Sequence, residues 1–362
     1  ALVCVVAALS YAHALRLRPR LLAAARGYDA ALERRHWRLL ATEPILGIGI
    51  VVAAALLLAY APPIDLAEQV AAVRSGPAPS VVRDASAVGS QLSVAAEAGS
   101  DIVNALVSPG RGGVSVEVRT LDAFEQPVAL PVRIAGATGA APCGAGCTRV
   151  ALAGSPAAVA VSVGARGRGY RVSLPIRYEP GQEGVARQLL ASVERSAGKL
   201  RSVAIDETLG SGTGTPEVTA YHVATPDRFA YRLSHDGRLV SDTTIVGTHE
   251  WTRDAGSERW QASVYGGGGP PFSAAGYLGW WTPFAGQPEL LDRFRVGGDE
   301  RADVATVSRI PDLGTVWLRI AIDVTQRRVL NIRMITVAHF MTQAWSAFDH
   351  APPIEPPVSY RK

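Results

Sequence analysis

Two long apolar segments open the chain, and their hydrophobic pattern predicts helices that cross a membrane. Residues 1–15 contain no Asp, Glu, Lys or Arg, and Ile45–Ala61 lies inside a stretch without charge that runs from Pro44 to Ile64. About 20 apolar residues are needed to cross the hydrocarbon core of a bilayer. A buried helix of a water-soluble protein would show a polar face at helical spacing, and this segment shows none. We therefore expect two transmembrane helices within residues 1–63.

The hydrophobic period becomes two after a linker, and this change predicts a β-sandwich. Residues 64–90 are rich in Ala, Ser, Pro and Gly and keep no regular period, which is typical of a linker. In residues 91–180, apolar and polar side chains alternate along short runs that Pro and Gly separate. The clearest apolar runs are Val114, Val116 and Val118, then Val159, Val161 and Val163, then Tyr170, Val172, Leu174, Ile176 and Tyr178. Such runs are typical of a small all-β sandwich.

The pattern in residues 181–362 predicts an α+β domain with one main helix. Apolar residues recur every four positions in Glu183–Leu200, which favours an amphipathic helix. These residues are Val185, Leu189, Val193 and Ala197. About ten runs of period two follow, and we expect a turn at Val324–Gln326 between two of the last ones. One helix packed against a long antiparallel sheet is an α+β arrangement.

Charge predicts the orientation of the chain in the membrane. Between the two apolar segments, residues 16–38 hold seven arginines and only two acidic residues. Short arginine-rich loops stay cytoplasmic, so the chain is expected in the cell (inner) membrane with everything after residue 63 periplasmic or extracellular. The net charge of +4 does not indicate nucleic acid, because the other arginines are interleaved with acidic residues along most of the chain.

The membrane part resembles a known family. The sequence RLRPR at Arg16–Arg20 and the sequence RRHWRLLATEPILGIGIVVAAALLLAYAPP at Arg34–Pro63 resemble the last two helices of the copper-resistance D (CopD) membrane domain. This resemblance implies copper handling across the inner membrane, with a copper ion or a copper chaperone as partner. The His and Met positions credited with copper lie mostly in earlier helices of that family. Because the chain opens at Ala1 inside an apolar segment, we interpret it as a fragment without those helices.

Two further resemblances concern the β-rich parts. The segment VSPGRGGVSVEVRTLDAFEQPV at Val107–Val128 is similar to immunoglobulin-like domains of the YtkA/FixH type. Three segments resemble the half-barrel of the LolA/LppX lipoprotein carriers. They are VATPDRFAYRL at Val223–Leu233, IVGTHEWTRD at Ile245–Asp254 and VWLRIAIDVTQRRVLNIRMI at Val316–Ile335. This second resemblance implies that an acyl chain or a lipoprotein is held between a curved sheet and its helix.

Cysteine, histidine and methionine supply the candidate metal ligands. Cys143 and Cys147 lie close together in PCGAGC, where an oxidising compartment favours a disulfide and a two-thiolate Cu(I) site is the alternative. His339 and Met341 are close enough in the sequence to bind copper together. Two residues on one face of a strand, however, more commonly pack against neighbouring side chains. They offer at most two soft ligands, so we expect no copper in the last domain. The sequence assigns no cofactor, and copper is the single candidate.

Enzyme signatures are absent from the sequence, whereas aromatic residues cluster. The chain has no G-x-S-x-G elbow, no Walker loop and no Rossmann glycine pattern, so we expect no catalytic activity. A dense aromatic group lies in residues 251–284. Its members are Trp251, Trp260, Tyr265, Phe272, Tyr277, Trp280, Trp281 and Phe284. They fit a packed core or the lining of an apolar pocket, with Trp280 and Trp281 as candidate lid residues.

Two functional hypotheses follow from these patterns. The first is a membrane-anchored, non-catalytic protein of copper homeostasis or copper transport, whose domains outside the cytoplasm bind a ligand. The second is a carrier or sensor of lipid or lipoprotein that is tethered to the membrane bilayer. In the second hypothesis, an acyl chain competes with the aromatic loop for the concave face of the last sheet, because one helix is too narrow to cover that face.

Overall fold

The computed structural model describes residues 91–110, 112–165, 167–267, 270–311 and 313–357. The expected transmembrane helices, their arginine-rich loop and the linker lie outside these residues, so those expectations remain predictions. None of the helices among the described residues has the length and the hydrophobicity that crossing a bilayer requires. Regular structure in the described part is mostly β-strand, with few helices, as the period-two runs predicted.

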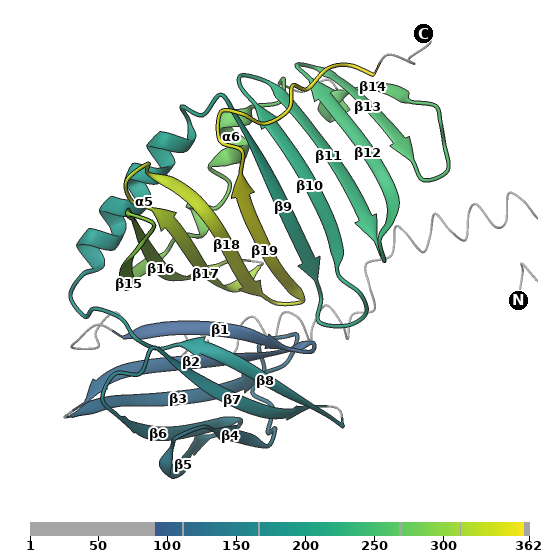
Figure 1. The fold of residues 1–362 in the computed structure, drawn as a ribbon. Coiled ribbons are helices and arrows are strands. Elements are labelled where there is room, and N and C mark those ends of the chain that lie inside the picture. Colours follow the sequence, from purple (N-terminus) through teal and green to yellow (C-terminus); the bar gives the residue numbers. More distant parts are fainter. Residues whose placement is uncertain (1–90, 111, 166, 268–269, 312, 358–362) are drawn as a thin grey trace, which may run out of the picture. The chain divides into compact units, whose positions relative to one another are not determined.

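The first eight strands form two antiparallel sheets that share one core. The strand order is β1-β2-β3-β6-β5 in the larger sheet and β4-β7-β8 in the smaller one (Figure 1). The strands are β1 Leu92–Ala98, β2 Asp101–Gly110, β3 Gly113–Leu121, β4 Val132–Ile134, β5 Thr138–Gly144, β6 Cys147–Ala153, β7 Ala158–Ala165 and β8 Arg168–Pro175. Alternation selects the buried face, since Val116 and Val118 of β3 share a core with Val161 of β7. The immunoglobulin-type assignment of these sheets stays a prediction.

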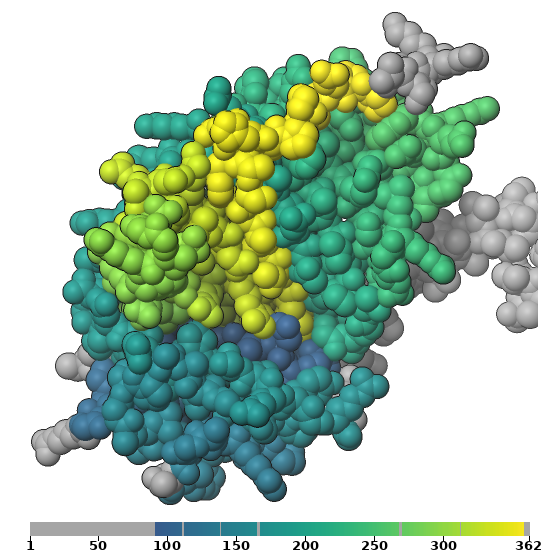
Figure 2. Space-filling view, in the orientation of Figure 1, coloured from purple at the N-terminus to yellow at the C-terminus, as the bar shows by residue number. Residues whose placement is uncertain are grey.

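The remaining strands form a single sheet of 11 antiparallel strands. Its order is β14-β13-β12-β11-β10-β9-β19-β18-β17-β16-β15. The strands are β9 Ser202–Gly210, β10 Glu217–Ala224, β11 Arg228–His235, β12 Arg238–Val246, β13 His249–Asp254, β14 Gln261–Val264, β15 Gln287–Val296, β16 Asp299–Ile310, β17 Gly314–Asp323, β18 Arg328–Thr336 and β19 His339–Ser346. In sequence order, β9 is the first strand of this sheet and β19 is the last, and the two pair with each other in the middle of the sheet. Figure 2 shows the C-terminal strand there in yellow. Segments distant in sequence therefore meet at the sheet centre.

Helix α5, Glu183–Ala197, packs against the β15–β18 side of the large sheet (Figure 1). Its buried residues are Ala186, Leu190, Val193 and Ala197. Two of the expected contacts, Val185 and Leu189, are only half buried, because the buried stripe is rotated by about one residue from the every-fourth-residue pattern. The short elements are η3 Tyr265–Gly267, α6 Ala274–Leu278 and η4 Thr282–Phe284. They lie in the aromatic segment, for which the sequence predicts a loop.

The small sheets and the large sheet are packed together through buried side chains. One cluster joins Ile102 and Leu121 of the small sheets to residues of the large sheet, which are Val307, Trp317, Ile335 and Phe340. The indole nitrogen of Trp317 donates a hydrogen bond of 3.0 Å to Ser93 Oγ. The described residues thus form one compact unit. Whether residues 91–180 and 181–362 behave as separate domains stays a prediction.

Candidate functional site

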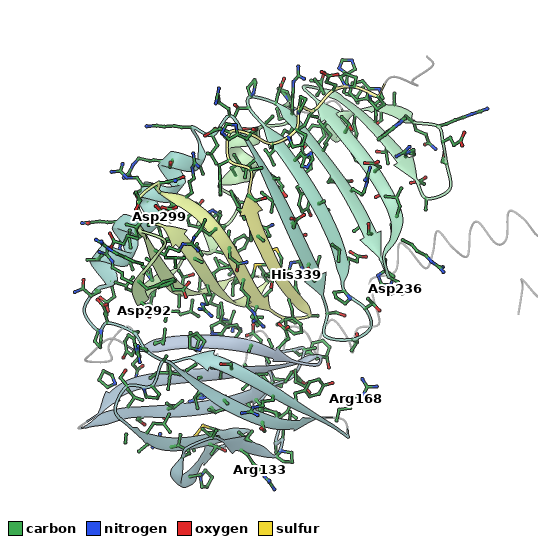
Figure 3. All side chains as sticks on the ribbon, in the orientation of Figure 1. Arg133, Arg168, Asp236, Asp292, Asp299 and His339 are labelled. Carbon is green, nitrogen blue, oxygen red and sulfur yellow. A yellow bond between two sulfur atoms is a disulfide. The ribbon has the colours of Figure 1, made fainter. Side chains whose placement is uncertain are left out.

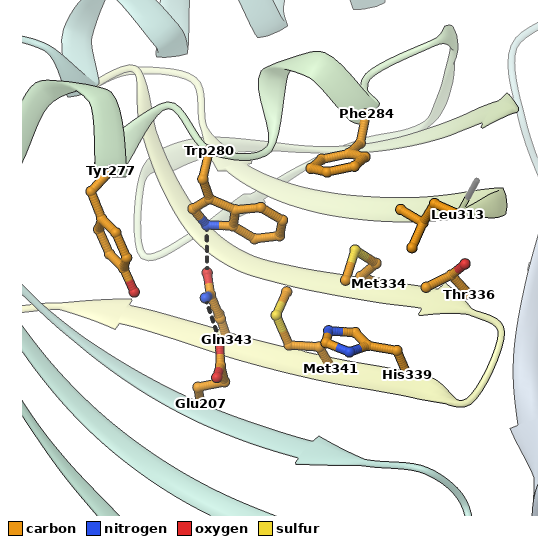
Figure 4. Close-up of a pocket in the computed structure, with 10 residues that line it drawn as sticks. All are labelled: Glu207, Tyr277, Trp280, Phe284, Leu313, Met334, Thr336, His339, Met341 and Gln343. Carbon is orange, nitrogen blue, oxygen red and sulfur yellow. Dashed lines mark hydrogen bonds between the residues drawn. The ribbon is translucent and has the colours of Figure 1, made fainter. Parts of the chain in front are cut away.

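A cavity of about 350 Å³ lies beside the large sheet (Figure 4). Strands β9, β18 and β19 form one wall, the segment from α6 to η4 forms the opposite wall, and the turn before β17 completes the rim. The lining residues are Glu207, Tyr277, Trp280, Phe284, Leu313, Met334, Thr336, His339, Met341 and Gln343. Most of these side chains are apolar or aromatic, and the polar ones lie toward two separate parts of the wall. The cavity therefore has an apolar middle.

The strand wall owes its composition to the register of the β18–β19 hairpin. Met334 lies directly opposite Met341, and Thr336 lies directly opposite His339. Side chains alternate between the faces of a strand, so residues two apart share a face. Gln343 therefore follows Met341 on the same face, and it lies opposite Glu207 of β9. Three neighbouring strands thus present a continuous row of side chains to the cavity.

Hydrogen bonds fix the opposite wall, which carries the aromatic residues. The hydroxyl of Ser273 accepts a hydrogen bond of 3.2 Å from the backbone N–H of Gly276 and caps α6. The Ser308 hydroxyl donates to the carbonyl of Phe284 at 2.9 Å, which ties η4 to strand β16. The indole nitrogen of Trp280 donates to Gln343 Oε1 at 3.2 Å. This wall is therefore anchored to strands β16 and β19 of the sheet.

The inner part of the cavity holds a buried polar network around Glu207. Its carboxylate accepts hydrogen bonds from the Tyr221 hydroxyl at 2.8 Å and from Gln343 Nε2 at 2.7 Å. Glu207 is 8% exposed and Gln343 only 2% exposed. Burial raises the pKa of Tyr221, and the charge of Glu207 and its hydrogen bond raise it further. Burial likewise raises the pKa of Tyr277, so both phenols stay protonated at neutral pH.

The outer part of the cavity combines apolar side chains with Thr336 and His339. Leu313 at the rim is 39% exposed, whereas Met334 and Met341 are buried. Figure 3 shows His339 on the C-terminal strand β19 of the large sheet. Burial lowers the pKa of His339, the charge of Glu207 opposes this effect, and the net shift leaves the imidazole neutral at pH 7. The outer part therefore carries no formal charge at neutral pH.

Thr336 and His339 face each other across the β18–β19 hairpin. The Thr336 hydroxyl is buried and has no hydrogen-bond partner among the described residues. It lies opposite His339, but no hydrogen bond joins this hydroxyl to the imidazole. A hydroxyl nucleophile is activated by a base within hydrogen-bond reach. Thr336 and His339 therefore do not form a nucleophile–base pair in this structure.

Three of the eight predicted pocket aromatics line the cavity. They are Tyr277, Trp280 and Phe284. The structure instead buries Phe272 and the expected lid residue Trp281 in the core, where Trp281 is 1% exposed. Tyr265 packs at the edge of that core. Trp251 is buried and stacks on His249, and Trp260 lies under the guanidinium of Arg253 at 4.8 Å. Only Trp280 of the two candidate lid residues faces the cavity.

Sequence reasoning identified His339 and Met341 and missed the rest of the strand wall. Glu207, Leu313, Met334, Thr336 and Gln343 were not predicted. The available signal was the spacing of Met334, Thr336, His339 and Met341 about a turn at Val337–Ala338. A hairpin centred on those two residues places the pairs opposite each other. The other three residues come from strands or turns that only the fold brings close.

The two cysteines lie elsewhere, at the ends of β5 and β6. Cys143 and Cys147 form a disulfide, with Cα atoms 5.1 Å apart. Glu117 lies within 4.8 Å of their sulfurs. Burial raises the pKa of Glu117, but hydrogen bonds from Arg119 and Arg149 outweigh this and hold the pKa below its ordinary value. Because both sulfurs are bonded to each other, a two-thiolate Cu(I) site would first require reduction of the disulfide.

Comparisons with known proteins give a likeness over about half of the chain. Neither a protein-family model nor a curated protein matches it. LprF of Mycobacterium bovis shows 12% identity and a TM-score of 0.37, over 49% of this chain and 98% of LprF. The lipoprotein LppX of Mycobacterium tuberculosis shows 9% identity and a TM-score of 0.34, over 47% of this chain and 99% of LppX. A LolA superfamily protein of Nitrosomonas europaea shows 9% identity and a TM-score of 0.22, over 45% of this chain and 94% of that protein.

Two of these structures, LppX and the LolA superfamily protein, carry the names of the class that the C-terminal part of the sequence resembles. None of them is a CopD protein or an immunoglobulin-like domain, so those two resemblances gain no support from them. The likeness concerns the fold over about half of the chain.

Proposed function

We propose that the C-terminal domain binds an apolar chain, such as a single acyl chain, in the cavity between β18–β19 and the α6–η4 segment. The protein then acts as a carrier or sensor of lipid or lipoprotein and not as an enzyme. The observation that carries this proposal is the cavity of about 350 Å³ with its apolar middle. Binding sites for small molecules are mostly apolar concave spaces of about 300 to 1,000 Å³ with a few placed polar groups.

The size of the cavity favours one chain over a whole membrane lipid. Its volume lies at the lower end of the usual range for ligand sites. Each methylene group that leaves water contributes about 0.8 kcal/mol, so eight of them contribute about 6 kcal/mol before the entropic costs of association. Met334 and Met341 suit such a guest because the flexible thioether side chain adapts to irregular apolar surfaces.

The polar groups predict the direction in which an acyl chain enters. Glu207 and Gln343 at the inner end are hydrogen-bonded to each other, so an apolar tail beside them leaves neither group without a partner. A carboxylate head group would be repelled by Glu207 there. The head group is therefore expected at the rim, near Leu313 and His339.

A titration with a fluorescent fatty acid tests the proposal on the full chain. The Leu313→Ser variant removes an apolar side chain from the rim, and Val264→Ser removes an exposed one from β14, away from the cavity wall. We expect saturable binding by the unmodified chain, several-fold weaker binding by Leu313→Ser and no change for Val264→Ser. Equal binding by all three proteins would place the probe outside the cavity and overturn the proposal.

Membrane tethering and location outside the cytoplasm are part of the same proposal. The arginine-rich residues 16–38 between two apolar segments support this orientation, and the disulfide fits an oxidising compartment. A single cysteine introduced at Ser257, in a Cys4→Ser background, should react with a membrane-impermeant reagent on intact cells. A cysteine introduced at Ala30 should not react. The reverse result would contradict the orientation.

The copper-homeostasis hypothesis rests on residues 1–63, which lie outside the described residues, and none of the comparisons supports it.

A further inference from the structure

Both methionines of the chain lie in the cavity. The sequence of 362 residues contains only two methionines, Met334 and Met341. They are direct partners across the β18–β19 hairpin, and both line the cavity. His339 precedes Met341 by two residues on the same strand face. Figure 4 shows the two thioethers and the imidazole gathered on the strand wall, opposite Trp280 and Phe284.

We propose that Met334, His339 and Met341 form a binding site for a soft monovalent cation, Cu(I) or Ag(I). This inference goes beyond the proposed binding of an apolar chain. From the sequence alone, His339 and Met341 offered at most two soft ligands, and no copper was expected in this domain. The register of the hairpin places a third soft side chain, Met334, opposite Met341, and the proposal rests on this observation.

The chemistry of the three side chains selects the class of metal. Thioether sulfur is a soft ligand that favours Cu(I), and imidazole nitrogen is a ligand for copper as well. The set contains no carboxylate, so Ca²⁺ and Mg²⁺, which require oxygen ligands, have little affinity for it. The nearest carboxylate in the lining, Glu207, is already held by Tyr221 and Gln343. A cation of low charge is also the one whose burial among neutral ligands costs least.

The aromatic wall protects a bound cation from water. Trp280 and Phe284 line the cavity opposite the three ligands. The face of an indole ring attracts a cation through its quadrupole, and the attraction is larger when the cation is desolvated. The hydrogen bond from Trp280 to Gln343 holds the indole at this place. The same wall therefore serves an apolar chain and a soft cation.

Calorimetric titration with Ag(I) tests the inference without a reductant, so the disulfide between Cys143 and Cys147 stays closed. The full chain carries Cys4→Ser, which removes its remaining thiol. We expect one Ag(I) per chain. The variants Met334→Leu and Met341→Leu, which keep the volume and remove the sulfur, should each weaken binding at least tenfold, and His339→Gln should do the same. His235→Gln, which changes an exposed histidine on β11, serves as the control and should leave the affinity unchanged.

The titration overturns the inference if the Cys4→Ser chain shows no saturable binding of Ag(I). It also overturns it if the Met334→Leu, Met341→Leu double variant binds as tightly as its parent. Thermal unfolding of each variant shows whether the fold is retained. Binding of the fluorescent fatty acid separates this inference from the proposed function, because both leucine variants keep an apolar wall. Loss of Ag(I) binding with retained fatty acid binding is the expected result for them.

Discussion

The indole nitrogen of Trp280 donates a hydrogen bond to the side-chain oxygen of Gln343 across 3.2 Å, and this bond joins the two walls of the cavity. The same oxygen accepts a second hydrogen bond from the indole of Trp345, also at 3.2 Å. The amide nitrogen of Gln343 donates to Glu207 at 2.7 Å. Gln343 is therefore the residue through which the aromatic wall is fixed to the strands.

Replacing Trp280 by Phe tests the role of this bond. The change removes the donor and keeps an aromatic ring, while Gln343 retains Trp345 as a partner. We expect a loss of stability of about 0.5 to 1.5 kcal/mol, the usual net value of one hydrogen bond, and several-fold weaker binding of a fluorescent fatty acid. Trp260→Phe, at a site outside the cavity lining, is the control. Equal binding by both variants would show that Trp280 does not shape the site.

Glu207→Gln tests the buried network at the inner end of the cavity. The carboxylate accepts hydrogen bonds from the Tyr221 hydroxyl and from the Gln343 amide nitrogen. In the variant, the NH₂ group of the new amide is itself a donor, so it faces one of these donors without accepting from it. We expect a loss of about 1 to 3 kcal/mol in the free energy of unfolding, the cost of a buried group without its partner. Urea unfolding measures it. Glu217→Gln, on an exposed position of β10, should change stability little, and a similar loss there would contradict the assignment.

A different carboxylate, Glu125, should dominate the contact between the small sheets and the large one. It is 4% exposed and accepts hydrogen bonds from Arg309 at 2.7 Å and from the backbone N–H and the hydroxyl of Thr315. We expect Glu125→Gln to cost about 3 kcal/mol at most, because Arg309 is partly exposed to solvent.

Glu97→Gln provides the matched control for this contact. Glu97 pairs with Arg333 across the same contact at 2.9 Å, but both side chains are exposed. Its substitution should cost less than about 1 kcal/mol. Urea unfolding of the two variants compares them. A larger loss for Glu97→Gln than for Glu125→Gln would show that burial does not determine the strength of this contact.

The pKa of His339 gives a prediction about pH. Burial holds this pKa below the ordinary value of 6.5, although the charge of Glu207 acts in the opposite sense. The unfolded chain therefore binds more protons than the folded one between the folded pKa and 6.5. The contribution of His339 to stability is complete above pH 6.5 and is lost as the pH falls toward the folded pKa. An NMR titration of the imidazole protons, assigned with His339→Gln, measures the value, and a pKa above 6.5 would contradict this prediction.

Hydrophobic periodicity was sufficient to predict much of the large sheet. The turn expected at Val324–Gln326 is confirmed, because β17 ends at Asp323 and β18 begins at Arg328. The helix expected from residue 183 is confirmed as α5, although its buried stripe includes Ala186 and Leu190 in place of the more exposed Val185 and Leu189. Small differences in the rotation of a helix decide which of two adjacent apolar residues is buried, and a pattern of period four does not resolve them.

The cavity was harder to predict because its residues meet only in three dimensions. Glu207 and Gln343 are 136 positions apart in the sequence. They meet because β9 and β19, the first and last strands of this sheet in sequence order, pair with each other. Trp280 and Trp281 are adjacent residues of the same type, yet only Trp280 faces the cavity. The turn between α6 and η4 decides this difference, and the aromatic density of the segment contains no information about it.

Photocrosslinking with a fatty acid that carries a diazirine at the end of its tail tests the central proposal most directly. The full chain is labelled, digested and mapped by mass spectrometry, with unlabelled fatty acid as competitor. We predict competitive labelling of peptides that contain Trp280, Met334 or Met341, because the tail enters the cavity first. Labelling confined to other surfaces, or labelling that the competitor does not displace, would contradict the proposal that this cavity binds an apolar chain.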